Sequence, residues 1–262
     1  MKISVVMQSY LGDYPGSRKN PEIKFVRAVT SFLSQKHNDK ELVIVSDGCE
    51  KTKQIYEMLY YHDSRIKFKY VEKSDKGRMY EVKDGKNFYR GIPRKIGCDL
   101  TDCDVIAYMD SDDIMLNNRL SDLADAWSTK SMDIKWASNP WRYIHGNAVK
   151  NKLFAESKRP AQPTKIIRLK DYGYDVSDDN LFFLNETATP KYINLATYSL
   201  SHRKDIEVSW QDSEDTDGKS APLSEDVLFA NNLHKLYGGV SRFFRQESAA
   251  YVVCHYRGVW DI

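Results

Sequence analysis

The stretch Val105-Ile-Ala-Tyr-Met-Asp-Ser-Asp-Asp113 places an apolar, strand-like run directly before three carboxylates. A buried strand that ends in clustered carboxylates is costly unless a cation neutralises them. The usual neutraliser of an Asp-x-Asp cluster is Mg²⁺ or Mn²⁺, bound through oxygen together with substrate phosphates. The alternative is that the acids cap the helix expected after them, for which one Asp would be enough. Three acids in this position favour the metal site.

The length and composition indicate one large domain. The chain has 262 residues, of which 41% are hydrophobic, so it can bury a sizeable core. The sequence contains no apolar run long enough to span a bilayer, and its first residues resemble a strand rather than a signal peptide. The four cysteines lack metal-finger spacing. We therefore expect reduced thiols in a cytoplasmic protein without a transmembrane segment.

Apolar periodicity predicts alternating strands and helices in the first half of the chain. Strands are expected at 3–8, 41–46, 66–71 and 105–108, and helices at about 21–36, 50–61, 89–100 and 116–127, with a loop over 72–87. This alternation indicates an α/β fold with a mainly parallel sheet and helices on both faces. Ligands bind at the carboxyl ends of such strands. Ser9, Tyr10, Asp47 and the acids at 110–113 are therefore expected to converge.

The second half is less regular. Strands are expected near 132–137 and 249–254, with short β-like runs between 168 and 217. Glu225 and Asp226 open a helix that has an apolar face. Residues 65–95 and 135–170 are strongly basic, whereas residues 171–226 are acidic. Such blocks are usually solvated faces, but they also suit an anionic partner.

Several short motifs resemble, in order, those of the inverting GT-A glycosyltransferases of family 2. Ser9-Tyr10 resembles the motif after the first strand, with Leu11 in place of the usual Asn. Further matches are Ser31–Gln35, Glu41–Gly48, Arg94–Gly97 (with Lys95 in place of Asn), Asp110–Asp113 and the pair Glu225-Asp226.

The resemblance implies a GT-A fold, with residues 1–262 forming a single domain. Residues 1–130 would bind the nucleotide sugar and residues 131–262 the acceptor. The implied activity is that of a hexosyl- or pentosyltransferase. It would move a sugar from a nucleotide sugar, a UDP sugar above all, to an acceptor hydroxyl by metal-assisted inverting displacement.

The resemblance also implies roles for individual residues. The metal, Mn²⁺ or Mg²⁺, would be held by Asp112 and Asp110, with His255 as a third ligand, and would stabilise the leaving diphosphate. The donor nucleotide would contact Ser9, Tyr10, Asp47, Arg94, Asp110 and Ser111. Asp226 would be the general base, with Glu225 as the second candidate.

Each assignment has a structural alternative. Asp47 could cap a helix, Tyr10 could pack in the core, and Arg94 could lie on a solvated helix face. Glu225 and Asp226 could simply compensate a helix dipole. A lone histidine such as His255 is more often structural than a metal ligand.

The acceptor stays open at this point. Basic residues interleaved with Trp136, Trp141 and Tyr143 suit a polyanion, such as DNA with a hydroxylated base. A lipid-phosphate-linked glycan or a surface polysaccharide is the competing acceptor. A nucleotidyltransferase would need a better glycine-rich loop than Leu11–Gly16. A non-catalytic sugar- or nucleic-acid-binding module would not need the acids. The sugar, the linkage and the oligomeric state are not encoded in any feature above.

Overall fold

The computed structural model describes residues 1–12, 20–72, 81–83, 86–88, 90–115, 118–128, 135–138, 142–143, 166–168, 181–186, 200–212, 225–237, 240–245 and 251–253. The fold and the site are described for these residues. His255, Trp141 and most of the basic block at 135–170 lie outside them.

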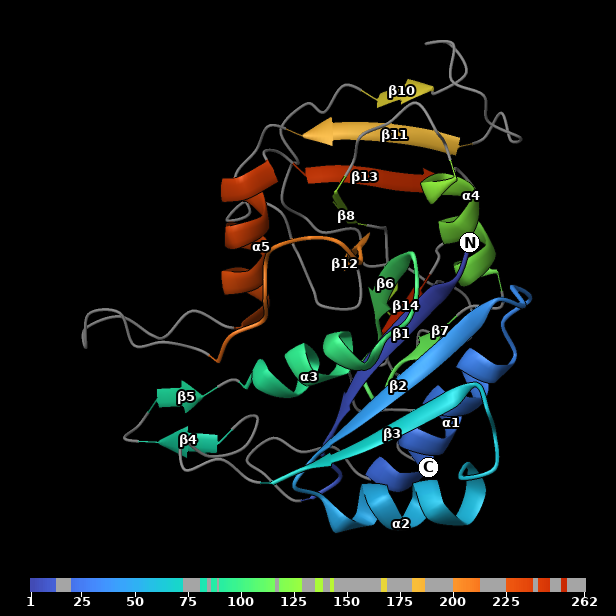
Figure 1. The fold of residues 1–262 in the computed structure, drawn as a ribbon, viewed down its shortest axis with the longest axis vertical. Helices are drawn as coiled ribbons and strands as arrows, with labels where there is room; N and C mark the ends of the chain where they lie inside the picture. Colours follow the sequence, from blue (N-terminus) through green and yellow to red (C-terminus); the bar gives the residue numbers. More distant parts are fainter. Residues whose placement is uncertain are drawn as a thin grey trace.

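Parallel strands from the first half of the chain form one half of a large sheet. They are β1 (Ile3–Ser9), β2 (Lys40–Asp47), β3 (Ile66–Val71) and β6 (Val105–Tyr108). β1 lies between β6 and β2, and β3 follows β2 (Figure 1). Every residue of β1 and β2 is buried. Continuous apolar and β-branched runs favour such strands, which are covered on both faces.

The other half of the sheet is mostly antiparallel and comes from the second half of the chain. Its strands are β8 (Trp136–Ser138), β10 (Ile166–Arg168), β11 (Leu181–Glu186), β12 (Leu200–Arg203) and β13 (Val240–Arg245). β12 joins the two halves, because it pairs antiparallel with both β6 and β8. Among the described residues the order is β10-β11-β13-β8-β12-β6-β1-β2-β3. The predicted parallel sheet is confirmed, and the antiparallel extension is additional.

Two smaller sheets lie beside this one. One contains β7 (Ile114–Met115), β14 (Tyr251–Val253) and β9 (Arg142–Tyr143). The other is the antiparallel pair β4 (Glu81–Lys83) and β5 (Lys86–Phe88). The prediction of a loop over 72–87 is therefore wrong for these two strands. Their sequences carry too few apolar residues to produce a periodic signal.

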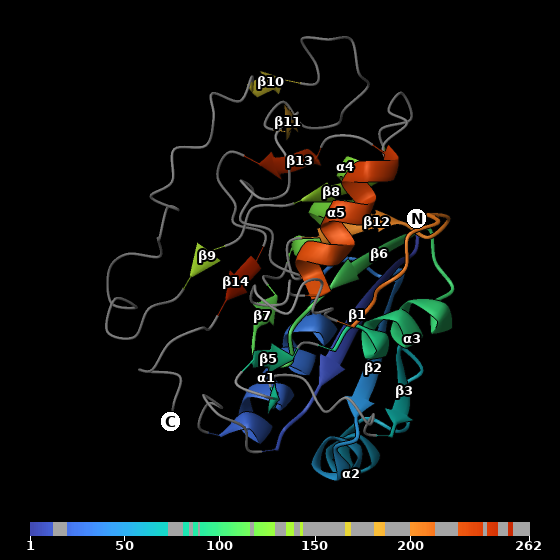
Figure 2. The same ribbon diagram turned by 90° about the vertical axis from the view of Figure 1, so that its left-hand side faces the viewer.

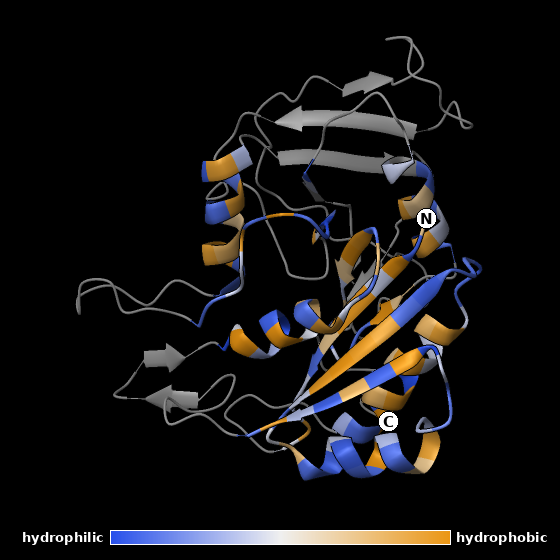
Figure 3. Ribbon diagram, viewed as in Figure 1, coloured by the Kyte–Doolittle hydropathy of each residue, from blue (hydrophilic) through white to orange (hydrophobic). Residues whose placement is uncertain are grey.

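Helices cover both faces of the sheet, as predicted. They are α1 (Pro21–Leu33), α2 (Glu50–Leu59), α3 (Ile92–Leu100), α4 (Arg119–Trp127) and α5 (Glu225–Tyr237). α1 and α3 lie on opposite sides of β1 and β2 (Figure 2). Phe25 of α1 and Trp127 of α4 belong to the core on one side, and Val6, Val45 and Phe229 to the core on the other. Hydrophobic residues gather in β1, β2 and β6 between these layers (Figure 3).

Helix α3 lies unusually close to the sheet. A Cβ atom at Gly97 would lie 2.5 Å from Cγ1 of Val6 and 3.2 Å from Cγ2 of Val45. A side chain at this position would have to displace the methyl group of Val6 and disturb the packing of α3 on the sheet. Gly97 therefore sets the height of α3, and of every side chain it carries, above β1 and β2.

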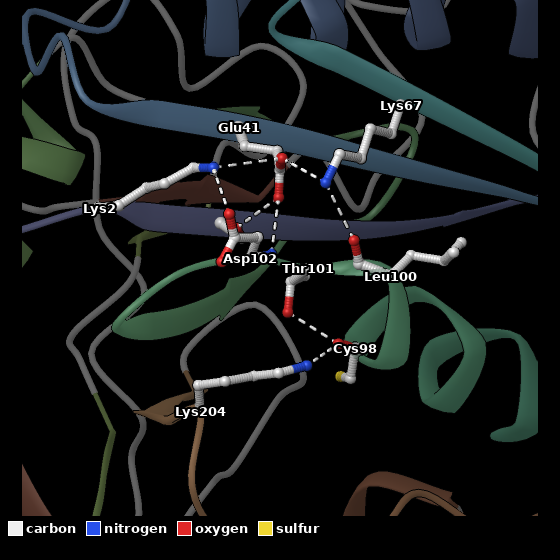
Figure 4. A network of polar contacts seen from close by, with 9 residues as sticks. Lys2, Glu41, Lys67, Cys98, Leu100, Thr101, Asp102 and Lys204 are labelled. Carbon is white, nitrogen blue, oxygen red and sulfur yellow. Dashed lines mark hydrogen bonds and ion pairs between the residues drawn. The ribbon is translucent and has the colours of Figure 1, made fainter.

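A polar network holds the C-terminal end of α3 at the edge of the sheet where the parallel strands begin (Figure 4). The Glu41 carboxylate lies 2.7 Å from Lys67 Nζ and accepts a 2.8 Å hydrogen bond from Ser4 Oγ. Lys67 also donates to the carbonyl of Leu100 at 3.1 Å, and Lys204 donates to the carbonyl of Cys98. Lysines at a helix C-terminus satisfy its last carbonyls and compensate its dipole. The network therefore fixes α3 to β1, β2 and β3.

None of the described helices has the length and hydrophobicity needed to cross a bilayer. Cys49, Cys98 and Cys103 are free thiols in the described part of the chain. Cys254 lies outside it.

Candidate active site

The carboxyl ends of β1, β2 and β6 bring most of the predicted site residues to one edge of the sheet. Ser9 pairs in register with Ser46, which directly precedes Asp47. Tyr108 ends β6 beside Val6, and Asp110 follows two residues later. The convergence predicted from a parallel sheet is therefore observed for Ser9, Asp47 and Asp110.

Arg94 connects the two acidic motifs of the sequence. Its Nη2 lies 3.3 Å from Oδ1 of Asp110, and its Nη1 forms an ion pair with Oε1 of Glu225. The Arg94 side chain is only 3% exposed, so it does not lie on a solvated helix face. Helix α3 thus places the buried guanidinium of Arg94 between the end of β6 and the start of α5.

The acids around Arg94 carry more negative charge than one guanidinium can neutralise. The pKa of Glu225 is raised to about 7, because burial and the charge of Asp226 together outweigh the lowering effect of Arg94. The pKa of Asp110 is also raised, first by burial and then by Asp112 and Asp226, while Arg94 opposes the shift. Asp110, Asp112, Glu225 and Asp226 therefore form one electrostatic unit.

The turn after β6 is fixed by its backbone. Nη2 of Arg27 in α1 donates to the carbonyl of Asp112 at 2.9 Å, and the amide of Asp113 donates to the carbonyl of Asp110 at 3.3 Å. Asp113 is fully buried, whereas Asp110 and Ser111 are partly exposed. The carboxylate that points inward is thus Asp113, and Asp110 stays accessible.

A complete metal site is not assembled within the described ranges, where no three His, Cys, Asp or Glu residues form a group that could hold an ion. The predicted third ligand, His255, lies outside those ranges. The metal roles of Asp110 and Asp112 therefore stay predictions.

Asp47 is fully buried and forms an ion pair with Arg90. Nη2 of Arg90 also donates to the carbonyl of Glu72 at 3.3 Å. Sequence reasoning missed Arg90, because a charged residue just before a helix is usually solvated. A buried carboxylate at a strand end needs a cation, and this requirement was the signal that could have pointed to Arg90.

Ser9 and Tyr10 continue β1 into the site. The Ser9 hydroxyl lies 3.1 Å from the Thr52 hydroxyl and is buried, so it is engaged inside the protein. Tyr10 is partly exposed and packs against the core on the α1 side. Tyr10 therefore lies at the boundary between the core and the edge of the site.

Gln8 is a second residue that sequence reasoning missed. Its side chain is 4% exposed, and neither amide atom has a hydrogen-bond partner in the described part of the chain. Side chains alternate along a strand, so Gln8 shares the α3 face with Val6. It lies in register with Val45 and, by extension of the β1–β6 ladder, beside Asp110. A buried amide without partners at this edge could form two or more hydrogen bonds with a ligand.

Comparison with known proteins identifies the family and the fold. The profile of the family described as Glycosyl transferase family 2 matches residues 20–188. No curated protein matches the chain in sequence. Among solved structures, residues 1–349 of S. aureus TarS in complex with UDP-GlcNAc superpose with a TM-score of 0.57 at 18% identity, covering 100% of this chain and 60% of that one. The complex with UDP gives 0.56 at 16% identity, covering 97% and 60%. The chain thus spans less than two thirds of that structure, and the likeness confirms the predicted fold.

Proposed function

The chain belongs to glycosyl transferase family 2, and we propose that this GT-A glycosyltransferase moves a sugar from a UDP sugar to an acceptor hydroxyl with inversion. The observation that carries the proposal is the position of Arg94 between Asp110 and Glu225. The donor-side acids and the acceptor-side acids thereby belong to one centre, which a transfer reaction requires.

A UDP sugar is the proposed donor because the similar TarS structures hold UDP and UDP-GlcNAc. The proposed donor contacts are Ser9, Tyr10, Asp47, Arg94, Asp110 and Ser111. Ser9 would contribute through its backbone, because its hydroxyl is engaged with Thr52. Asp47 is already paired with Arg90, so these two residues would present the base with a combined carboxylate and guanidinium edge. The amide of Gln8, which has no hydrogen-bond partner among the described residues, adds a donor and an acceptor that a uracil or sugar could use.

The donor set at the end of β6 fits a hard cation. Asp110 and Asp112 offer oxygen ligands, and the pKa of Asp110 is raised first by burial and then by the charges of Asp112 and Asp226, which a bound cation would offset. Mg²⁺ typically takes one or two protein carboxylates and completes its shell with substrate phosphates and water, and Mn²⁺ prefers similar ligands. Asp110 and Asp112 would hold the ion, with His255 as a candidate third ligand. When bound, the ion would stabilise the negative charge of the departing diphosphate.

Asp226 is the proposed general base. It is partly exposed, whereas its neighbour Glu225 is buried against Arg94. The Asp226 carboxylate would take the proton of the acceptor hydroxyl as that oxygen bonds to the anomeric carbon. The bond between the anomeric carbon and the β-phosphate oxygen breaks at the same time, and UDP leaves with its electron pair. Glu225 would hold Arg94 rather than take the proton.

The acceptor is proposed to be polyanionic, such as DNA with a hydroxylated base, because two basic blocks flank the site motifs in the sequence. A lipid-phosphate-linked glycan would use the same basic residues. Filter binding to duplex DNA and to vesicles containing anionic lipid, at rising salt, separates these acceptors. If neither is bound at low salt, the acceptor is not polyanionic.

The donor proposal is tested by thermal unfolding with a panel of nucleoside diphosphates and nucleotide sugars, each with Mn²⁺ or with EDTA. UDP and at least one UDP sugar are expected to raise Tm, and Mn²⁺ to increase the shift. A protein that responds to a GDP or ADP sugar but not to UDP would contradict the choice of base. No response to any nucleotide would contradict the proposed donor class.

A further inference from the structure

We propose that Trp210 and Asp212 are positioning residues, which hold the first turn of α3 so that Arg94 stays between Asp110 and Glu225. The inference rests on the proposed function, because it concerns how that reaction's buried guanidinium is kept in place. Neither residue belongs to a sequence motif of the site. Both come from the segment 200–212, which lies far along the chain from α3.

Asp212 caps α3 from outside the helix. Its Oδ1 accepts hydrogen bonds from the backbone amides of Gly91 at 2.9 Å and Ile92 at 3.1 Å. The helix's own cap residue is Gly91, which has no side chain to do this. A carboxylate at this position satisfies free amides and compensates the helix dipole. The start of α3 therefore depends on a residue 121 positions further along.

The contact between the two segments is close as well as polar. A Cβ atom at Gly91 would lie 2.0 Å from the carbonyl oxygen of Gln211. The backbone of 210–212 thus presses directly on the backbone that precedes α3, and Gly91 is the residue that permits it. A shift of this segment would shift the first turn of α3, which carries Arg94.

Trp210 is held in place by Phe229 and Tyr108. Its ring stacks on Phe229 of α5, with centroids 4.1 Å apart and an interplanar angle of 10°. Its Nε1 donates to the hydroxyl of Tyr108 at 2.8 Å. Tyr108 in turn donates to Nε2 of His202 at 2.6 Å, because His202 Nδ1 lies 2.7 Å from the Arg203 carbonyl and must carry the ring proton. The indole is therefore a fixed, buried platform on β6 and α5.

The guanidinium of Arg94 lies over this platform. Its Cζ is 5.2 Å from the Trp210 ring centroid, and the Trp210 residue is 2% exposed. A cation over an indole face is attracted by the ring quadrupole, and the attraction is stronger in a desolvated site. Trp210 thus closes one side of the Arg94 guanidinium, while Asp110 and Glu225 bind its edges. Loss of the platform would leave Arg94 charged but free to adopt other rotamers.

The test measures UDP release from a UDP sugar that stabilises the protein, using the full chain and its variants. Because Trp210 and Asp212 act through Arg94 and do not themselves contact the donor, Trp210→Leu and Asp212→Ala are each expected to lower kcat about 10- to 100-fold and to change donor KM in the same direction as Arg94→Met, but by less. Trp210→Phe and Asp212→Asn keep the aromatic face and the acceptor oxygen. They are expected to retain kcat within about fivefold.

A double-mutant cycle with Arg94→Met separates positioning from a general structural role. In the Arg94→Met protein, Trp210→Leu is expected to cause no further loss of kcat, although it still lowers Tm. The proposal would be overturned if Trp210→Leu lowered kcat by the same factor in the Arg94→Met protein as in the parent. It would also be overturned if Asp212→Asn lowered kcat as much as Asp212→Ala.

A failure of the proposed function is recognised separately, because the parent protein would then release UDP from no UDP sugar. In that case the thermal unfolding of the parent, the two single variants and the double variant tests the positioning role. Coupling between Arg94 and Trp210 is expected as a smaller Tm loss from Trp210→Leu in the Arg94→Met background. Equal Tm losses in both backgrounds would overturn the positioning role.

Discussion

The guanidinium of Arg94 and the carboxylate of Glu225 form a buried ion pair, although 131 positions separate them in the sequence. Arg94 belongs to the first turn of α3, in the half of the chain that carries the parallel strands. Glu225 is the first residue of α5, which packs on the same face of the sheet. The pair therefore connects the proposed donor half to the proposed acceptor half through two charges that have almost no contact with solvent.

Replacing Arg94 with Met is expected to destabilise the protein by roughly 3–5 kcal/mol, because Glu225 would be left buried without its cation. Turnover is expected to fall by at least about 100-fold, since Asp110 and Glu225 lose their shared partner. Urea unfolding and UDP release measure the two effects. Lys95→Met is the matched control, because Lys95 is the next residue and, among the described residues, forms an ion pair with Asp99 at the surface. Equal effects of both variants would contradict the role of the pair.

Asp226→Asn is expected to lower kcat about 10²- to 10⁴-fold with little change in donor KM, because the amide cannot accept the acceptor proton. Steady-state UDP release in the presence of a working acceptor measures this. Asp205→Asn, at an exposed position, serves as the control for the removal of one surface charge. Full turnover by Asp226→Asn would move the base assignment to another residue.

Asp112→Ala is expected to remove the difference that Mn²⁺ makes to UDP binding, because the ion loses one of its two proposed carboxylates. Calorimetric titration of UDP, with Mn²⁺ and with EDTA, measures the difference directly. Asp102→Ala controls for charge, since Asp102 is exposed and precedes β6 at the opposite edge of the sheet. If UDP still binds more tightly with Mn²⁺ in Asp112→Ala, Asp112 is not a ligand.

The framework of this site could be predicted because its signals are local. β1, β2 and β6 are continuous apolar runs, and their parallel order follows from the alternation with helices. Strand ends of a parallel sheet share one edge, so Asp47 and Asp110 could be brought together without coordinates. The hairpin of β4 and β5 was missed although Asp84-Gly85 between the two strands is a favoured turn dipeptide.

The partners of these acids could not be predicted, because they depend on tertiary contacts. Arg90 and Arg94 look like ordinary helix charges in the sequence, yet both are buried against carboxylates. Trp210 and Asp212 lie in no periodic segment, so no pattern connects them with α3. The antiparallel half of the sheet is built from strands of three to six residues, which are too short for a reliable periodicity.

Gln8 and Gln35 are equally buried but differ in their hydrogen bonds, which makes them a matched pair. The Gln35 amide donates to the carbonyls of Ser31 at 3.1 Å and Met115 at 3.3 Å and accepts from the Leu120 amide at 3.1 Å, whereas the Gln8 amide has no partner in the described residues. Gln35→Leu is therefore expected to destabilise the protein by about 1–3 kcal/mol, and Gln8→Leu to stabilise it by about 1 kcal/mol.

Urea unfolding of the two variants tests this difference, and UDP titration tests whether the Gln8 amide serves the donor. Gln8→Leu is expected to weaken UDP binding while Gln35→Leu leaves it unchanged. A stability loss in Gln8→Leu similar to that in Gln35→Leu would show that the Gln8 amide is satisfied in the free protein.

The buried imidazole of His202 predicts a pH dependence of stability with a definite sign. Burial lowers the pKa of His202 to about 4, helped by Lys204 and opposed by the Arg203 carbonyl and Asp205. In the unfolded chain the same group titrates near 6.5, so between these values the unfolded state binds more protons. Stability should therefore fall as pH drops below about 6.5, by up to about 2 kcal/mol at pH 5 from this group alone. His202→Gln should lose less than the parent over that interval, whereas His62→Gln, at an exposed position, should follow the parent. Urea unfolding at pH 7.5, 6.5 and 5.0 measures the slopes, and parallel slopes for the parent and His202→Gln would contradict the buried neutral imidazole.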